Sequence, residues 1–299
     1  MNRLRYITIT ALWLFMSIAV QGQVVKEKDN RAIDSATIAN ADWHHHEEEG
    51  IRIGYSEFDH LFGAPQIVFV LEIPHNEIHR LRYAYDRELT EVSLQAKKYN
   101  ALAAVNGSFF DMVLGNPVCY LRIEGEEVGI NTAPKNGDTT QRKYYQYATL
   151  CLDGDSMAFV VPDADRFHER TLPYPDVMTA GPMLIIDSGI VMQRNDRNFI
   201  TNRHNRTAVG QRADGTVVIV VVDGRHKGHA EGMSIPQLSQ MMLWMGCRNA
   251  INLDGGGSTT FYFDSDAFDN KDGVMNYPSD NATFDHGGER FVSSILYVK

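Results

Sequence analysis

The chain has 299 residues, 43% of them hydrophobic and 22% charged, which supports a folded core and excludes wholesale disorder. Its formal net charge of −10 disfavours sequence-independent binding to nucleic acid, because such binding depends on clustered Lys and Arg side chains. An anionic ligand would therefore need a local cationic pocket.

The N-terminus has the form of an export signal. Arg3 and Arg5 precede an apolar stretch from Ile7 to Val20, and the sequence turns polar at Lys26. The stretch is shorter than the ~20 apolar residues of a membrane helix, so residues 1–22 are predicted to be a signal peptide. We expect an exported protein, periplasmic or extracellular, with no stable membrane span after cleavage.

Residues 23–49 are polar and lack periodicity, which predicts a linker. The run from His44 to His46 suggests a metal site only weakly, because adjacent residues of a flexible segment face different ways. No composition shift follows, so residues 50–299 are predicted to form a single domain. Cys119, Cys151 and Cys247 are expected to be buried thiols with at most one bridge.

Apolar, β-branched runs bounded by turn residues predict the strands of a mixed β-sheet core, in an α/β or α+β fold. Helices packed on the sheet are predicted at Thr90–Tyr99 and Ser234–Met245; the second has Ser234 as N-cap and Gln237 three residues later. The predicted strands are Ile67–Ile73, Ala101–Val105, Met183–Ile186, Thr207–Gly210, Thr216–Val222, Ala250–Leu253 and Phe291–Val298.

One strand-helix-strand unit organises the predicted sheet. Thr216–Val222 leads through the Ser234 helix into Ala250–Leu253, while Asp214 and Gly215 predict a hairpin turn before the first strand. If the two strands of the unit are parallel, their carboxyl ends lie at one edge of the sheet, where α/β proteins commonly bind ligands. Asp223 and Asp254 would share that edge.

Three predicted strands end in an Asn or Asp followed by Gly: Asn106–Gly107, Asp223–Gly224 and Asp254–Gly255. A single Asx-Gly pair is ordinary turn chemistry. Three copies, each after an apolar run, point to a shared site.

The third copy continues as Gly256, Gly257 and Ser258. Consecutive glycines are expected to expose backbone N–H groups as an anion-binding nest, which favours a phosphate or a sugar phosphate. No Lys follows at the position that a Walker A loop requires, and Ser258 does not stand between glycines as in a nucleophile elbow.

Cationic residues lie close in sequence to these carboxylates. Arg206 precedes Thr207, and Arg225 follows Gly224 directly. A guanidinium group matches a phosphate with two parallel hydrogen bonds, so Arg206 is the preferred phosphate ligand.

At these residues the chain resembles the phosphodiester glycosidase family, in the segments Ala104–Asp111, Arg206–Gly210, Val220–Gly224, Gly232–Leu238 and Ile251–Thr260. The resemblance implies hydrolysis of a sugar-1-phosphodiester at the glycosidic C–O bond, in a phosphorylated carbohydrate or glycan, with no required cofactor. Asp223 and Asp254 are the candidate catalytic carboxylates, with base and nucleophile left open. The candidate substrate-binding residues are Asn106, Gly107, Arg206, Thr207, Gly224, Arg225, Gly255, Gly256, Gly257 and Ser258.

The sequence departs from the family at Gln237, where members often carry Glu. Glu231, a few residues earlier, is therefore a third candidate carboxylate. Two alternatives remain open. One is a metal-dependent phosphoesterase in which Asp223, Asp254 and His226 hold a divalent cation; the other is a non-catalytic carbohydrate-binding protein of the cell envelope.

Overall fold

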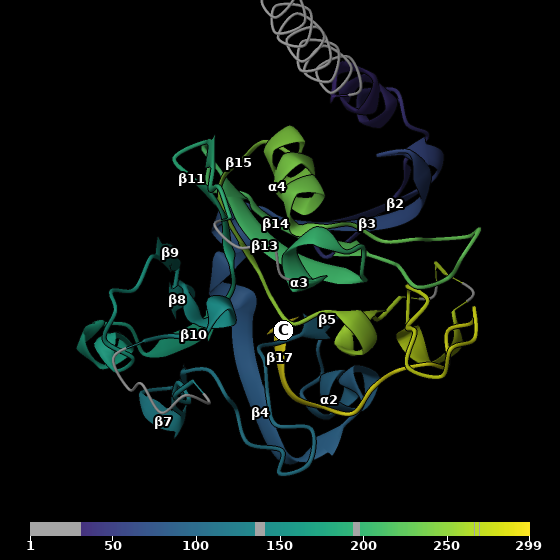
Figure 1. Cartoon of the computed structure of the whole chain (residues 1–299). Helices are drawn as coiled ribbons and strands as arrows, with labels where there is room; N and C mark the ends of the chain where they lie inside the picture. The colour runs from purple at the N-terminus through teal and green to yellow at the C-terminus, as the bar shows by residue number, and fades with distance from the viewer. Residues whose placement is uncertain (1–30, 135–140, 194–197, 266, 269) are drawn as a thin grey trace, which may run out of the picture. The chain divides into compact units, whose positions relative to one another are not determined.

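The computed structural model describes residues 31–134, 141–193, 198–265, 267–268 and 270–299 (Figure 1). The predicted signal peptide, residues 1–22, lies outside these ranges. Within them, no helix has both the length and the apolar character needed to cross a bilayer.

The chain divides into two compact units. The first comprises residues up to Ala41 together with Leu61–Gly63, and the second comprises Asp42–His60 and Ala64–Lys299. In the first unit a helix spans residues 31–39, and its Asp34 accepts a hydrogen bond from the Phe62 N–H at 2.9 Å. In the second unit strand β1 begins at His44. The predicted linker over residues 23–49 is therefore wrong from residue 31 onward, because these polar residues form regular backbone hydrogen bonds.

An eight-stranded sheet dominates the second unit. In spatial order its strands are β1 (His44–Glu48), β2 (Ile51–Leu61), β3 (Ala64–Ile73), β14 (Val217–Val222), β13 (Arg206–Arg212), β15 (Cys247–Asn252), β11 (Met183–Ile186) and β12 (Gly189–Ile190). Strand β2 pairs antiparallel with β1, and from β3 to β12 each strand pairs antiparallel with the next in this order.

Two smaller sheets complete the second unit. The four-stranded sheet has the order β16 (Phe261–Phe263), β5 (Ala103–Asn106), β17 (Val292–Val298) and β4 (Leu81–Thr90). The five-stranded sheet has the order β7 (Glu126–Gly129), β6 (Leu121–Ile123), β10 (Asp176–Ala180), β8 (Ala148–Asp153) and β9 (Ser156–Val160).

Short helices connect and cover these sheets. The α-helices are α2 (Val92–Lys98), α3 (Asn198–Thr201) and α4 (Ile235–Trp244). The 3-10 helices are η1 (His75–Arg80), η2 (Tyr144–Gln146), η3 (His168–Thr171), η4 (Gly256–Ser258) and η5 (Lys271–Gly273).

Helix α4 begins as the sequence predicts. The Ser234 hydroxyl accepts the Gln237 N–H at 3.4 Å, and the Gln237 side-chain oxygen accepts the Ser234 N–H at 3.0 Å. This reciprocal pair is a capping box, in which Glu and Gln are interchangeable at the third position. Gln237 therefore has a structural role at the start of α4, which explains why Glu or Gln can occupy this position.

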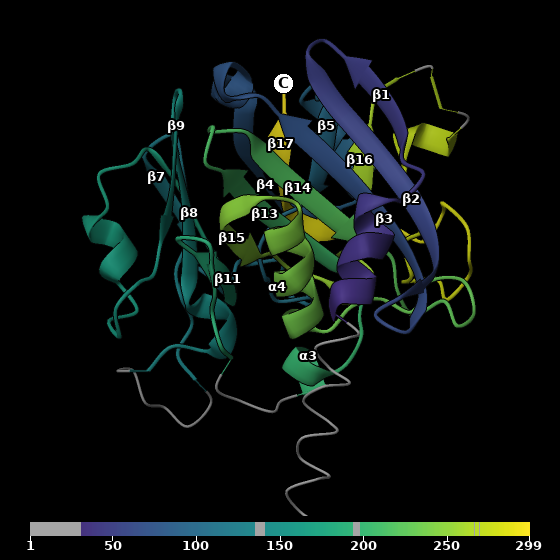
Figure 2. The same cartoon turned by 90° about the horizontal axis from the view of Figure 1, so that it is seen from above.

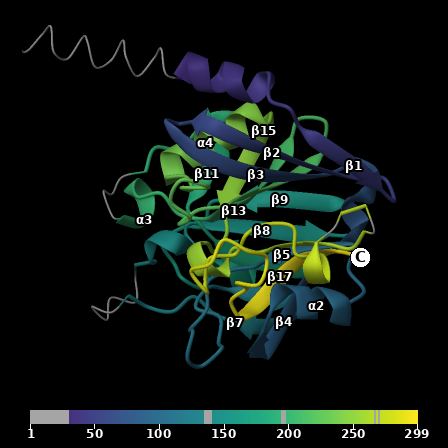
Figure 3. The same ribbon diagram turned by 90° about the vertical axis from the view of Figure 1, so that its right-hand side faces the viewer.

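The second unit is layered, with α4 on one side of the eight-stranded sheet, the four-stranded sheet on the other, and α2 beyond it (Figures 1 and 3). Alternation along β17 shows how the sequence builds this arrangement. Leu296 and Val298 belong to the main core, which also contains Phe69 and Ile219, whereas Ile295 and Tyr297 pack in a second cluster with Val92 and Ala96 of α2. The five-stranded sheet lies to one side (Figure 2) and adds Leu121, Leu150 and Met178 to the main core.

The predicted strands and the Asp214–Gly215 hairpin are present, with boundaries shifted by at most three residues. Cys119, Cys151 and Cys247 are all buried and free, so no bridge forms.

Candidate active site

Three strand ends converge on one region of the second unit. Strands β14 and β15 both pair antiparallel with β13, so they run in the same direction and end at the same edge. Asp223 follows β14 directly, and Asp254 stands two residues beyond β15. Asn106, the last residue of β5, reaches this edge from the four-stranded sheet and donates from Nδ2 to the Asp254 carbonyl at 2.8 Å.

Asn106 positions the backbone around Asp254. Its Oδ1 accepts the Thr207 hydroxyl at 2.7 Å and the Thr260 N–H at 3.4 Å, and the residue is 1% exposed. The Gly107 carbonyl accepts the Asp254 N–H at 3.2 Å. Asn106, Gly107 and Thr207 therefore act on the site by holding Asp254 in place.

Asp223 is fully buried, and both of its carboxyl oxygens are occupied. Oδ1 accepts from Asn276 Nδ2 at 2.8 Å, and Oδ2 accepts from the Tyr277 N–H at 3.0 Å. Burial raises the pKa of Asp223 to about 7, and the two hydrogen bonds oppose that rise. Because Asn276 Nδ2 also meets the Thr259 carbonyl at 3.3 Å, Asp223 fastens the segment that carries the glycine run.

Asp254 remains partly exposed. Burial raises its pKa to about 6, opposed by the Gly255 N–H, the Ser258 hydroxyl, and the charges of Arg290 and Arg225. The Gly255 N–H donates to Oδ1 at 2.8 Å. The Ser258 hydroxyl is buried and lies near enough to Asp254 to lower this pKa. It does not, however, meet the distance and angle of a hydrogen bond with any described residue.

The two carboxyl groups differ in their hydrogen bonds. Both oxygens of Asp223 accept hydrogen bonds, one from Asn276 and one from Tyr277. Asp254 accepts the Gly255 N–H through Oδ1, and the residue is partly exposed. Of the two, Asp254 is therefore the better placed to meet a ligand.

The glycine run differs from the expected anion-binding nest. The Gly255 N–H is taken by Asp254, and the Gly256 N–H donates to the Asn205 carbonyl at 2.9 Å. What the glycines provide is space. A Cβ on Gly256, whose φ is +64°, would lie 2.6 Å from Arg225 Nη2, and a Cβ on Gly257 would overlap the guanidinium group of Arg290.

Two guanidinium groups thus lie against the glycine run beside Asp254. Arg225 has a left-handed backbone, with φ of 63°, and burial together with the charge of Arg290 lowers its pKa. Arg290 Nε donates to Asp280 Oδ1 at 3.0 Å. The sequence analysis did not identify Arg290 as a site residue.

Arg206 is placed differently from the sequence-based expectation. Its Nε donates to the Met233 carbonyl at 2.8 Å, and Nη2 donates to the carbonyls of Phe199 and Asn202 at 2.8 and 3.1 Å. The side chain is 1% exposed, and burial with the nearby Arg225 charge lowers its pKa to about 9. Arg206 therefore clamps backbone segments, while Arg225 and Arg290 are the cations next to Asp254.

Several buried polar atoms nearby have no described partner, among them Ser258 Oγ, Thr259 Oγ1 and Thr260 Oγ1 of the glycine-run segment. Asn205 Nδ2 is unpaired, while Oδ1 of the same side chain accepts the Ser279 hydroxyl at 3.1 Å. His204 Nδ1 is also unpaired; burial and the charges of Arg206 and Arg225 lower its pKa to about 4, which keeps the ring neutral at pH 7. Unpaired buried polar groups are uncommon, and a ligand is one way to satisfy them.

An aromatic cluster joins the segment after β5 to η2 and α3. The Phe109 and Tyr145 rings stack at 4.7 Å, and Phe199 meets Phe109 at 6.1 Å and Tyr144 at 4.9 Å. Burial raises the pKa of Tyr145, and the charges of Cys119, Tyr144 and Asp254 add to that rise. The sequence carried no spacing signal for this cluster, because its members come from three segments far apart in the chain.

Gly224 and Glu231 belong to the adjoining loop. A Cβ on Gly224 would lie 2.6 Å from the Asn205 nitrogen and 3.0 Å from the Gly232 Cα, so the glycine permits close backbone packing. The Glu231 N–H donates to the Pro65 carbonyl at 3.0 Å.

The donor set of the metal-dependent alternative does not assemble. His226 directs Nε2 to the Tyr277 carbonyl at 3.2 Å, and Asp223 has both oxygens occupied. In the described ranges, no three His, Cys, Asp or Glu side chains gather as a metal-binding group.

Sequence comparison finds relatives of this chain among known proteins. The family model for phosphodiester glycosidases matches residues 99–299. N-acetylglucosamine-1-phosphodiester alpha-N-acetylglucosaminidase of Bos taurus is 37% identical over 83 residues, which are 28% of this chain and 14% of the bovine protein. An uncharacterized SPbeta prophage-derived protein of Bacillus subtilis is 47% identical over 57 residues, 19% of this chain and 9% of that protein. The matched segments thus span only a small part of these relatives.

Solved structures share the fold. The catalytic domain of the zebrafish N-acetylglucosamine-1-phosphodiester alpha-N-acetylglucosaminidase, auto-inhibited by its pro-peptide, superposes with a TM-score of 0.65 at 20% identity, covering 87% of this chain and 86% of that one. A hypothetical protein from Synechocystis gives a TM-score of 0.64 at 14% identity, covering 86% and 64%. Because the family model covers more than half of the 299 residues and includes every strand end at the site, the chain belongs to the phosphodiester glycosidase family.

Proposed function

We propose that the protein hydrolyses a sugar-1-phosphodiester at the glycosidic C–O bond, releasing free sugar and a phosphomonoester. The observation that carries the proposal is the partly exposed Asp254, with a raised pKa, beside Arg225 and Arg290. The bovine and zebrafish relatives, whose names describe glycosidases of N-acetylglucosamine-1-phosphodiesters, support the same reaction class.

The two guanidinium groups suit the phosphate. As the C–O bond breaks, negative charge grows on the departing phosphate oxygen, and fixed cations stabilise it in the transition state. The leaving phosphomonoester is a good leaving group, so it needs little help from a general acid. The amide of Asn205 supplies a further buried donor close to the glycine run.

Asp254 is the carboxyl that reacts. With a pKa of about 6 it is mostly ionised at pH 7, and it either attacks the anomeric carbon or takes a proton from the attacking water. The oxygen atom of water becomes bonded to the anomeric carbon of the sugar, and the electrons of the broken C–O bond leave with the phosphate. Asp223 supports the glycine-run segment through Asn276.

The aromatic cluster of Phe109, Tyr144, Tyr145 and Phe199 offers flat apolar faces to the sugar ring. We further propose that the substrate is a phosphorylated glycan and that the protein is exported. The N-terminal sequence pattern supports export, as does the fold shared with a Burkholderia pseudomallei protein described as a suspected exported protein, which has a TM-score of 0.54 at 18% identity and covers 78% of this chain.

Hydrolysis of a methyl phosphodiester of N-acetylglucosamine 1-phosphate in ¹⁸O-labelled water tests the proposal. Cleavage at the glycosidic bond leaves the released methyl phosphate without ¹⁸O, which mass spectrometry detects. Label in the phosphate instead would identify a phosphoesterase and refute the proposed bond. Binding of the diester without release of sugar would identify a carbohydrate-binding protein and refute turnover.

A further inference from the structure

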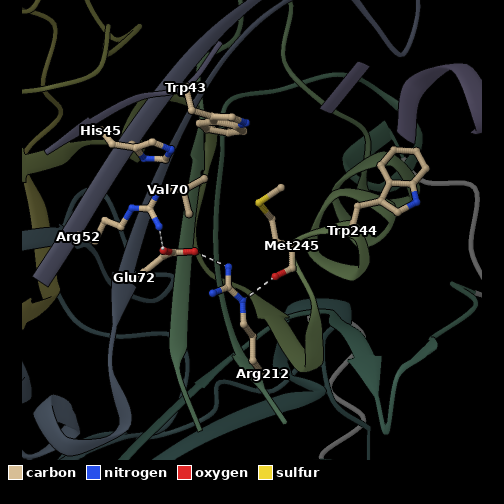
Figure 4. A pocket seen from close by; sticks show the side chains of 9 residues that line it. Trp43, His45, Arg52, Val70, Glu72, Arg212, Trp244 and Met245 are labelled. Carbon is tan, nitrogen blue, oxygen red and sulfur yellow. Dashed lines mark hydrogen bonds and ion pairs between the residues drawn. The ribbon is translucent and has the colours of Figure 1, made fainter. Parts of the chain in front are cut away.

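A second cavity lies at the far end of the eight-stranded sheet. It has a volume of ≈ 210 Å³ and is lined by residues of β1, β2, β3, β13 and the end of α4 (Figure 4). Arg212, the last residue of β13, pairs with Cys247, the first residue of β15, whereas Asp254 follows the other end of β15. A six-residue strand spans about 20 Å, so the cavity is separate from the candidate active site.

Both tryptophans of the described residues, Trp43 and Trp244, line this cavity. Trp43 stacks on His45 with ring centroids 6.3 Å apart and meets Phe58 edge-on at 6.0 Å, which fixes the indole ring. Gly54 makes room for this arrangement, because a Cβ there would lie 2.7 Å from His45 Nδ1. The result is a pair of large aromatic side chains around a small, preformed space.

The polar side of the cavity has an excess of positive charge. Glu72 takes ion pairs from Arg212 and, at 3.6 Å, from Arg52, so that one carboxylate faces two guanidinium groups. Arg212 Nε also donates to the Met245 carbonyl at 2.8 Å (Figure 4). Arg52 is 47% exposed. In a chain with a net charge of −10, this local excess selects an anionic group.

We propose that this cavity binds a single anionic sugar unit, a pyranose ring carrying phosphate. The indole rings would contact the ring face, and Arg52 with Arg212 would bind the phosphate. The cavity is smaller than the ~300–1,000 Å³ of drug-sized ligand sites, which suits one sugar ring. The choice of a sugar phosphate rests on the proposed function, since both the phosphorylated polymer and a released sugar phosphate present this unit.

Titration of the full chain with α-D-glucose 1-phosphate, followed by calorimetry and tryptophan fluorescence, tests the assignment. The Asp254→Asn, Arg225→Gln double variant weakens binding at the candidate active site and isolates the second cavity. In this background we expect one site per chain, with fluorescence quenching, and an affinity reduced at least fivefold by Arg52→Gln. Arg248→Gln is the matched control, because Arg248 is an exposed, ion-paired arginine outside the cavity.

Several results would overturn the assignment. No saturable binding in the double variant, or equal loss in Arg52→Gln and Arg248→Gln, removes the cavity as a site. If inorganic phosphate binds as tightly as α-D-glucose 1-phosphate, the sugar ring does not contribute to binding. If methyl α-D-glucopyranoside binds as tightly, the phosphate charge does not contribute. If the double variant binds the sugar phosphate but wild type hydrolyses no diester, the proposed reaction is refuted and the cavity assignment stands. Competition experiments distinguish the two sources of the ligand. A phosphorylated polysaccharide that displaces α-D-glucose 1-phosphate indicates binding of the polymer, and the absence of displacement indicates binding of the free sugar phosphate.

Discussion

Asp223 and Asp254 each follow an apolar strand and precede a glycine, yet their carboxyl groups have different surroundings. Asp223 is fully buried, with hydrogen bonds to both oxygens, and it ties Asn276 to the glycine-run segment. Asp254 is partly exposed, binds one backbone N–H, and lies beside two guanidinium groups. The same sequence pattern thus produces a structural carboxyl at one strand end and a candidate reactive carboxyl at the other.

The substitution Asp254→Asn should distinguish the roles of the two carboxyl groups most clearly. We expect kcat to fall by about 10³-fold, because the amide can neither take a proton nor attack carbon. Its Oδ1 still accepts the Gly255 N–H, and the amide removes a charge whose pKa is raised by burial, so the thermal unfolding temperature should not fall. Steady-state kinetics and calorimetry measure both, with Asp264→Asn at an exposed position as the control. Retained turnover would remove Asp254 from the mechanism.

Substitution of Arg225 tests whether the neighbouring positive charge is needed for the reaction at Asp254. Arg225→Gln is expected to lower kcat by roughly 10²-fold, because one charge that stabilises the departing phosphate is lost. The charge of Arg225 lowers the pKa of Asp254, so the acidic limb of the kcat/KM profile should move upward from about pH 6.

Lys227→Gln is the matched control for that experiment, since it removes a cation from the same exposed loop. An acidic limb that stays in place in Arg225→Gln would show that another group titrates.

Asp223→Asn should act mainly on stability. The amide cannot accept from both Asn276 and Tyr277, and a buried unmet hydrogen bond costs about 1–3 kcal/mol. The folded pKa of Asp223, about 7, lies above the ~3.9 of an unfolded chain, so wild type loses stability as pH rises between these values. The free energy of unfolding of Asp223→Asn should therefore fall less between pH 5 and pH 8 than that of wild type, as denaturant titrations at the two pH values would measure. A large loss of kcat with unchanged stability would reverse the two assignments.

The smallest effect is expected at Gln237. Gln237→Glu keeps the capping box at the start of α4, so stability should stay within about 0.5 kcal/mol and kcat should not change. A rise in kcat would mean that a carboxylate at this position takes part in the reaction.

The sequence predicted the strand ends and the start of α4 because their signals are local: an apolar run, an Asx-Gly pair, and a Ser with Gln three residues on. The five-stranded sheet was missed, since strands such as β6 and β7 are three and four residues long and only partly buried. The glycine run was assigned the wrong task. Sequence shows that something approaches these glycines closely, but not whether it is a ligand or, as here, the side chains of Arg225 and Arg290.

The buried position of Asn106 bears on how the protein can be produced. Asn106, Gly107 and Ser108 form an Asn-X-Ser acceptor, which a eukaryotic secretory host can glycosylate. Both polar atoms of the Asn106 side chain are engaged inside the fold, with no room for a glycan. A chain modified there could not join β5 to the backbone of Asp254, so expression in a bacterial host should yield the native protein, whereas chains that mammalian cells glycosylate at Asn106 should misfold.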